Sequence, residues 1–220
     1  AVGEGEFQLY TEPFTKREES CHLIEYYSVD NVEKREIPKK QCVFVDNTVP
    51  EVEKSLGEPK LESTVITEFE VPEPYDIKDN AWYISQDTEI TLSCKDLEPH
   101  PSDNVHIYYK YYNDGALVQD WVQYNGPFTY EEDTYHELYY YCQDALGNKG
   151  PVHYELDIVD TTGPSLSKEV GDPKHACEGN EECDWYITRN TEITLTCQDP
   201  EPHPVDEASI YWRDYLDGQV

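Results

Sequence analysis

Hydrophobic and polar residues alternate along several short stretches of the chain. From Thr88 to Lys95 and from Val152 to Val159 the alternation has a period of two, which is typical of half-buried β-strands. His106 to Tyr112 and Tyr135 to Cys142 are rich in Tyr and Ile, which favour a pleated surface. The sequence contains no amphipathic helical stretch of useful length. The pattern therefore predicts strands.

Turn residues separate these predicted strands. Asn113-Asp114-Gly115, Asn125-Gly126-Pro127 and Leu146-Gly147-Asn148 supply the positive φ angles that hairpin turns require. Short strands at a spacing of about 8–12 residues, with turns between them, are typical of an antiparallel β-sandwich. We expect an all-β fold of this kind.

The chain repeats itself twice. The segment from Trp82 to Gly115 recurs from Trp185 to Gly218 at a shift of 103 residues, with 20 of 34 positions identical. A second match, at a shift of 114 residues, places the segment that starts at Phe7 on the segment that starts at Trp121. The same shift places Asp46 to Pro50 on Asp160 to Pro164.

The two shifts predict one complete domain between two half-domains. Residues 1–49 form the C-terminal half of a unit, residues 50–163 form a complete unit, and residues 164–220 form the N-terminal half of another. The boundaries lie at Asp46 and Pro50, and at Asp160 and Pro164. The chain also lacks Met, so we expect a processed chain or a piece of a longer one. We expect each half-unit to be well ordered only when a partner completes it. The simplest partner is another copy of the chain in a head-to-tail polymer or array, with Val220 near Ala1 of the next copy.

Composition excludes some classes of function. The chain has 47 acidic and 16 basic residues and a formal net charge of −31, which excludes a nucleic-acid binder because phosphate contacts need a basic surface. Nineteen Tyr and four Trp can fill a core, so the charge indicates a solvated surface on a folded protein. No apolar run approaches the roughly 18 residues that would span a membrane, and we expect no membrane insertion.

Seven cysteines without metal-type pairs indicate an oxidising compartment. Cys94 and Cys142 lie in two predicted strands 48 residues apart, a separation that suits a bridge between facing sheets beside a core with Trp82 or Trp121. Cys177 and Cys183 bracket a short loop, and a bridge between them is the simplest pairing. Cys21 and Cys42 could then tie one hairpin, although other connectivities remain open. Cys197 is the repeat counterpart of Cys94, but Ser28 stands where Cys142 would be.

Several segments resemble a known class of repeats. These are Gly126-Pro127-Phe128-Thr129, the Tyr-rich strands that lead to Asn31 and Asn148, and the boundary at Asp46. In these segments the chain resembles tandem bacterial and archaeal Ig-like surface repeats. The resemblance implies tandem Ig-like β-sandwich domains in an acidic extracellular, cell-surface structural protein. It also implies a filament, a stalk, a surface layer or an adhesion protein.

Candidate chemistry is sparse. Glu98-Pro99-His100-Pro101, which recurs at Glu201 to Pro204, places a His near Asp96 and Asp103, but a stiff proline turn explains it better than a metal site. Calcium is the more plausible metal, with carboxylates and backbone carbonyls at Asp46 and Asp160, although a solvated acidic face explains these residues more simply. We therefore expect no cofactor and assign no metal ligand, keeping calcium as the alternative.

Catalytic motifs are missing from the sequence, and a repeated feature is typical of an interface rather than of an active site. We expect a non-catalytic structural module. The alternative is a carbohydrate- or host-binding adhesin segment, in which the outer half of the tyrosine clusters at Tyr108 to Tyr112 and Tyr139 to Tyr141 would bind glycans.

Overall fold

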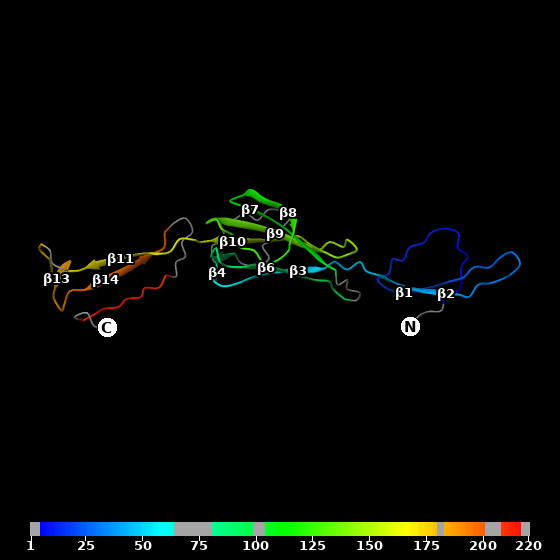
Figure 1. The fold of residues 1–220 in the computed structure, drawn as a ribbon, viewed down its shortest axis with the longest axis horizontal. Helices are drawn as coiled ribbons and strands as arrows, with labels where there is room; N and C mark the ends of the chain where they lie inside the picture. The colour runs from blue at the N-terminus through cyan, green and yellow to red at the C-terminus, as the bar shows by residue number, and fades with distance from the viewer. Residues whose placement is uncertain (1–4, 64–80, 99–103, 180–182, 201–207, 217–220) are drawn as a thin grey trace.

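A computed structural model describes residues 5–63, 81–98, 104–179, 183–200 and 208–216. Every regular element in these ranges is a β-strand, as the sequence pattern predicts, and none of them holds a helix long and apolar enough to cross a membrane (Figure 1). The strands are β1 Ser20–Tyr26, β2 Lys39–Val45, β3 Glu51–Leu56, β4 Lys60–Glu62, β5 Trp82–Ile84, β6 Ile90–Lys95, β7 His106–Asn113, β8 Ala116–Gln123, β9 Tyr135–Gln143, β10 His153–Val159, β11 Ser165–Val170, β12 Lys174–Ala176, β13 Trp185–Ile187 and β14 Ile193–Gln198.

The middle unit, residues 50–163, contains two packed layers. One layer is a six-stranded sheet in the order β4-β5-β10-β9-β7-β8, and the other contains the antiparallel pair β3-β6. All neighbours in the larger sheet are antiparallel except β5 and β10, which run parallel. The pattern-predicted strands correspond to β6, β7, β9 and β10. The all-β sandwich prediction is therefore confirmed.

Turn chemistry places the hairpins where the sequence indicates. Asp114 and Gly115, between β7 and β8, both have positive φ, at 44° and 74°. Gly147, between β9 and β10, has a φ of 93°. Such angles are costly for most side chains and cheap for glycine, which explains the turn residues at these positions.

The core of the middle unit lies between its two layers. Buried side chains from β3, β5, β6, β9 and β10 meet there, together with Tyr130. The disulfide between Cys94 and Cys142 joins β6 to β9 across the layers, so the predicted bridge is present. Trp82 packs against this core, whereas Trp121 lies on the outer face. The buried cluster comprises Val52, Ile84, Ile90, Leu92, Tyr130, Leu138, Tyr140, Cys142 and Val159.

The two ends of the chain reproduce parts of the middle unit. The pair β1-β2 matches β9-β10 in register, because His22 lies opposite Val43 as His136 lies opposite Asp157. In the last half-unit, residues 164–220, β11-β14 matches β3-β6 and β12-β13 matches β4-β5. The first half-unit, residues 1–49, and the last half-unit lie at opposite ends of the elongated molecule (Figure 1).

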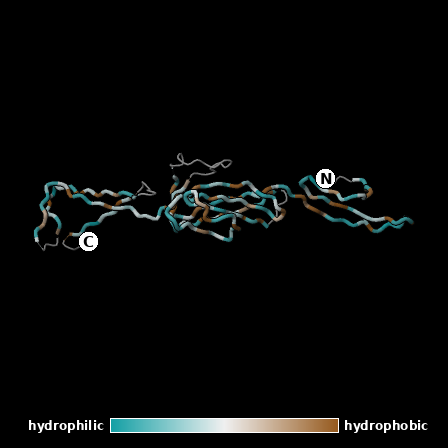
Figure 2. The backbone as a smooth tube through the Cα atoms, turned by 90° about the horizontal axis from the view of Figure 1, so that it is seen from above, coloured by the Kyte–Doolittle hydropathy of each residue, from teal (hydrophilic) through white to brown (hydrophobic). Residues whose placement is uncertain are grey.

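Side chains that are buried in the middle unit are exposed at their repeat positions in the half-units. Ile90 is fully buried, whereas its counterpart Ile193 is 54% exposed. Tyr140 is 2% exposed and its counterpart Tyr26 is 46% exposed. In Figure 2 the backbone strands of the middle unit lie close together, whereas those at the two ends form open pairs. Each half-unit thus presents an uncovered apolar face.

Candidate metal centre at the first unit boundary

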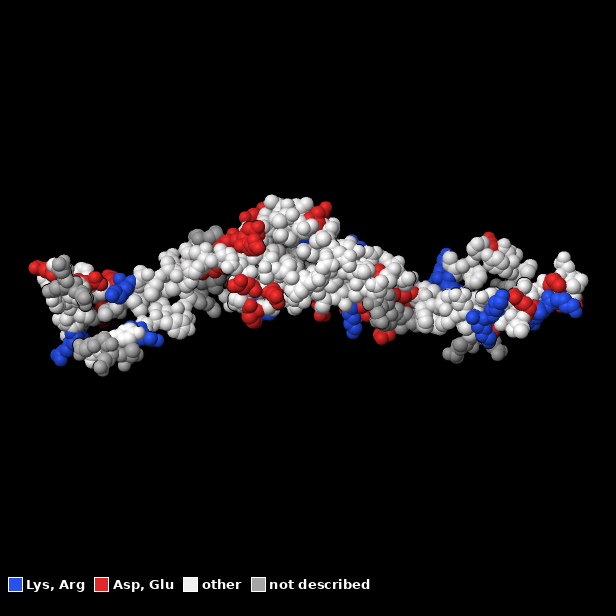
Figure 3. Space-filling view, in the orientation of Figure 1, with Lys and Arg blue, Asp and Glu red and all other residues white. Residues whose placement is uncertain are grey.

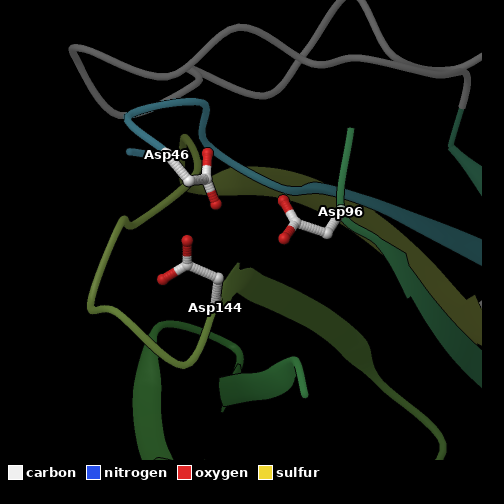
Figure 4. Close-up of side chains that lie close together, drawn as sticks. All are labelled: Asp46, Asp96 and Asp144. Atoms are coloured by element: carbon white, nitrogen blue, oxygen red, sulfur yellow. The ribbon is translucent and has the colours of Figure 1, made fainter. Parts of the chain in front are cut away.

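Three aspartates from distant parts of the sequence meet at one end of the middle unit. Asp46 follows β2 of the first half-unit, Asp96 follows β6, and Asp144 follows β9. One carboxylate oxygen from each lies within 4.8 Å of the other two. Figure 4 shows the three side chains pointing toward a shared space. We call these residues the aspartate cluster.

A tight turn holds Asp144 in place. Its Oδ1 accepts hydrogen bonds from the backbone N–H groups of Leu146 at 2.9 Å and Asn148 at 2.8 Å. The side-chain amide of Asn148 donates to Asp144 Oδ2 at 2.7 Å and to the backbone carbonyl of Asp46 at 3.2 Å. Asn148 thereby connects the turn after β9 to the segment that enters the middle unit.

The segment that enters the middle unit passes very close to the turn that follows Asp144. Pro50 is fully buried, and a Cβ atom placed on Gly150 would lie 2.5 Å from the carbonyl oxygen of Pro50. Real Cβ contacts are not that short, so only glycine allows the two backbones to meet here. This contact fixes the position of the segment that carries Asp46 relative to the turn that carries Asp144.

Burial makes the aspartate cluster electrostatically costly. Asp46 and Asp96 are each 8% exposed and Asp144 is 3% exposed. Two unit charges 4.8 Å apart repel by about 3.5 kcal/mol at an effective dielectric constant of ~20. Asp46 Oδ1 accepts a hydrogen bond from the backbone N–H of Thr48 at 3.0 Å, but Asp46 Oδ2 is buried without a hydrogen-bond partner. Buried polar atoms normally have partners, so this oxygen is a candidate ligand atom.

The repeats place two equivalent aspartates at the second unit boundary and the third in the first half-unit. Asp160 and Asp199 are the counterparts of Asp46 and Asp96, and both line one open pocket. Asp160 Oδ1 accepts from the backbone N–H of Thr162 at 2.9 Å, as Asp46 does from Thr48. The counterpart of Asp144 is Asp30, whose Oδ1 accepts from the backbone N–H groups of Val32 and Lys34 in the same type of turn. The three positions therefore hold aspartate throughout the repeats.

The sequence identified only part of this arrangement. It singled out Asp46 and Asp160 as boundary residues with suitable oxygen ligands, and it considered Asp96 only beside His100. The structure places Asp96 beside Asp46, and residues 99–103 and 201–207, which include both histidines of the Glu-Pro-His-Pro segments, lie outside the described residues. Asp144 was missed altogether. Its recurrence as Asp30 at the 114-residue shift was the signal that could have identified it.

The remaining cysteines match the sequence-based pairing in part. Cys177 and Cys183 form a disulfide. The Sγ atoms of Cys21 and Cys42 lie 2.7 Å apart on β1 and β2 as exposed free thiols. Cys197 is also a free thiol. The two disulfides indicate an oxidising environment outside the cytosol.

The tyrosine clusters divide between the two faces of the large sheet. Tyr109 and Tyr111 pack against the core, as the alternation along a strand predicts. On the outer face, Tyr108 stacks on Tyr141 at 5.3 Å between ring centroids, and Trp121 meets Tyr141 edge to face at 4.9 Å. The ammonium group of Lys149 lies 3.7 Å from the Tyr141 ring centroid. These rings thus contact one another across the strands.

No family model, curated protein or solved structure matches this chain. The structure itself shows an all-β sandwich with internally repeated strand pairs and an aspartate cluster at the first unit boundary.

Proposed function

We propose that the chain is a non-catalytic structural repeat module of an extracellular filament, stalk or surface layer, with Ig-like units whose half-units complete one another. One observation carries the proposal. The strand pairs at the two ends reproduce complementary parts of the middle unit in register, and they expose the side chains that form the core there.

In the middle unit, β9-β10 covers β3-β6 and continues the sheet from β5. The proposal places β1-β2 of one copy against β11-β14 and β12-β13 of the next in the same way. Covering apolar surface is the dominant favourable term in such an association. Because the two half-units lie at opposite ends of the molecule, this contact is head to tail and does not close, which generates a linear array (Figure 1).

Charge limits how readily such an array forms. The formal net charge is −31, so copies repel one another at low ionic strength. On the face shown in Figure 3, acidic side chains gather over the middle unit and basic side chains gather over the first half-unit. Physiological salt screens charges beyond about 8 Å, and association is therefore best tested at that ionic strength or above.

Three sequence differences distinguish the proposed join between identical copies from the middle unit. Ser28 would lie opposite Cys197, where the middle unit has the Cys142–Cys94 disulfide. Lys168 would face Gln41 and Val43, where Lys54 faces Glu155 and Asp157. The join would lack both the disulfide and the buried ion pair, so we expect identical copies to associate reversibly.

The Ser28→Cys variant tests the proposed contact. A thiol at position 28 would reach Cys197 of a neighbouring copy only if the half-units pack as the middle unit does. After mild oxidation at high protein concentration, we expect a ladder of covalent multimers on non-reducing gels, with the 28–197 linkage identified by mass spectrometry. The matched control is Ser28→Cys combined with Cys197→Ser, which should lose that linkage. Monomers alone, or cross-links through other cysteines only, would show that the half-units do not join in this way.

A glycan-binding adhesin segment is the second candidate, supported by the exposed edge of Trp121, which is 38% exposed beside Tyr141. Much of the outer aromatic face is unavailable, however, because Tyr139 and Tyr154 are 6% and 2% exposed. A glycan array probed with the wild type and Trp121→Ala separates the two functions. The structural proposal predicts no binding above background for either protein, whereas a glycan signal that Trp121→Ala abolishes would favour the adhesin.

A further inference from the structure

We propose that the aspartate cluster binds one calcium ion, and that this ion fastens the first half-unit to the middle unit. The ligands are carboxylate oxygens of Asp46, Asp96 and Asp144. This inference concerns a single chain, so it stands apart from the proposed assembly between copies.

The first argument is the unsatisfied oxygen. Asp46 is more than nine-tenths buried, its Oδ2 has no hydrogen-bond partner, and its side chain points toward the other two carboxylates (Figure 4). A cation between the three carboxylates supplies the missing partner and removes their mutual repulsion. Among the described residues, no lysine or arginine forms an ion pair with Asp46 or Asp144. Within the part of the chain that the structure describes, a protein cation therefore does not fulfil this role for these two residues.

The second argument is the type of ligand. The cluster offers only oxygen atoms, which select hard cations such as Ca²⁺ and Mg²⁺ over zinc or copper. Carboxylate oxygens within 4.8 Å of one another are close enough for one Ca²⁺ ion, with ligand distances of about 2.3–2.6 Å, to lie among them. Magnesium requires near-ideal octahedral geometry at about 2.0–2.1 Å and keeps several waters. Three buried carboxylates from three separate segments suit the more flexible coordination of calcium.

The third argument is recurrence. Asp30, Asp160 and Asp199 occupy the three equivalent positions, although the sequence around them varies. Lys34, for example, replaces Asn148 in the turn after the first of them. Backbone hydrogen bonds account for aspartate in the turns, and the recurrence of a carboxylate at all three positions agrees with a shared metal ligand.

The position of the ion gives it a mechanical consequence. Asp46 belongs to the segment between β2 and β3, while Asp96 and Asp144 belong to the body of the middle unit. One ion bound to all three restrains the chain segment that connects the first half-unit to the middle unit. It therefore stiffens the boundary against bending.

Calorimetric titration of the full chain, freed of metal by a chelator, tests the proposal directly. Titration with CaCl₂ to a few millimolar covers the affinities of about 10⁻⁴–10⁻³ M that are typical of extracellular calcium modules. We expect one saturable site, and we expect Asp46→Asn, Asp96→Asn and Asp144→Asn each to weaken it at least about tenfold, because calcium affinity follows the number of charged ligands. Hydrogen exchange should slow on calcium addition at residues 45–50 and 144–150.

Asp30→Asn is the matched control. It removes a carboxylate from the same type of turn, but one that lies outside the aspartate cluster, so binding should be unchanged. If Asp144→Asn loses its circular dichroism spectrum, Asp46→Asn and Asp96→Asn decide the matter. The site is refuted by the absence of saturable binding, or by binding that none of the three variants weakens. Equal affinity for Mg²⁺ at matched ionic strength would overturn the choice of calcium.

Discussion

Replacing both Cys94 and Cys142 with alanine is expected to lower the free energy of unfolding of the middle unit by about 4 kcal/mol. The disulfide closes a loop of 48 residues, and the chain-entropy model gives this value for a loop of that length. The lost contacts of Cys142, which is fully buried in the core, add to the cost.

Hydrogen exchange in β9 and β10 of the full chain reports this loss for the middle unit alone. The control is Cys177→Ala with Cys183→Ala, which removes a bridge of similar chemistry from the last half-unit. That bridge closes a loop of only 6 residues away from the middle unit, so protection in β9 and β10 should remain. Equal protection in both double variants would mean that the Cys94–Cys142 bridge does not stabilise the sandwich.

Local chemistry explains why much of the fold could be predicted. The alternation from Thr88 to Lys95 identified β6 because one face of that strand is buried and the other is not. The glycines at 115 and 147 marked turns that need positive φ. The repeats then carried this information to the last half-unit, where Thr191 to Gln198 alternates as Thr88 to Lys95 does and contains β14.

The candidate site was predictable only in part, because it depends on contacts between distant residues. Asp46, Asp96 and Asp144 are separated by about 50 residues each, and no local pattern links them. In a chain with 47 acidic residues, any one carboxylate is uninformative. Likewise, the sequence could not distinguish Trp82, which packs on the core, from Trp121, which lies on the outer face.

The contact between Lys54 and β10 is another long-range feature that the sequence did not reveal. Lys54 Nζ lies 2.6 Å from Asp157 Oδ1 and 2.8 Å from Glu155 Oε2, and Tyr140 also donates a hydrogen bond to Glu155. The side chains of Lys54 and Asp157 are 1% and 0% exposed. Burial lowers the pKa of Lys54, but the attraction of Asp157 and then of Glu155 outweighs it, so the pKa is raised. Burial raises the pKa of Asp157, against the opposing attraction of Lys54.

Lys54→Met is therefore expected to destabilise the middle unit by about 3–5 kcal/mol at neutral pH, because it leaves two buried carboxylates without their cation. Lys168→Met, at the exposed repeat position, should change stability by less than about 0.5 kcal/mol. The repeats also suggest a rescue, since Gln41 and Val43 stand where Glu155 and Asp157 stand in the middle unit. Lys54→Met combined with Glu155→Gln and Asp157→Val should regain most of the lost stability, because replacing a whole buried ion pair with apolar groups is often neutral.

The pH dependence gives the same prediction an independent check. Without Lys54, the pKa of Asp157 in the folded state rises further above that of the unfolded chain, so the folded state takes up a proton first as the pH falls. A group of this kind makes the folded state relatively more stable at low pH. The cost of Lys54→Met should therefore shrink between pH 7 and about pH 4, toward the ordinary pKa of aspartate near 3.9. Denaturant unfolding of both proteins across this range measures the difference, and a cost that stays constant or grows on acidification would show that Lys54 does not act by neutralising Asp157.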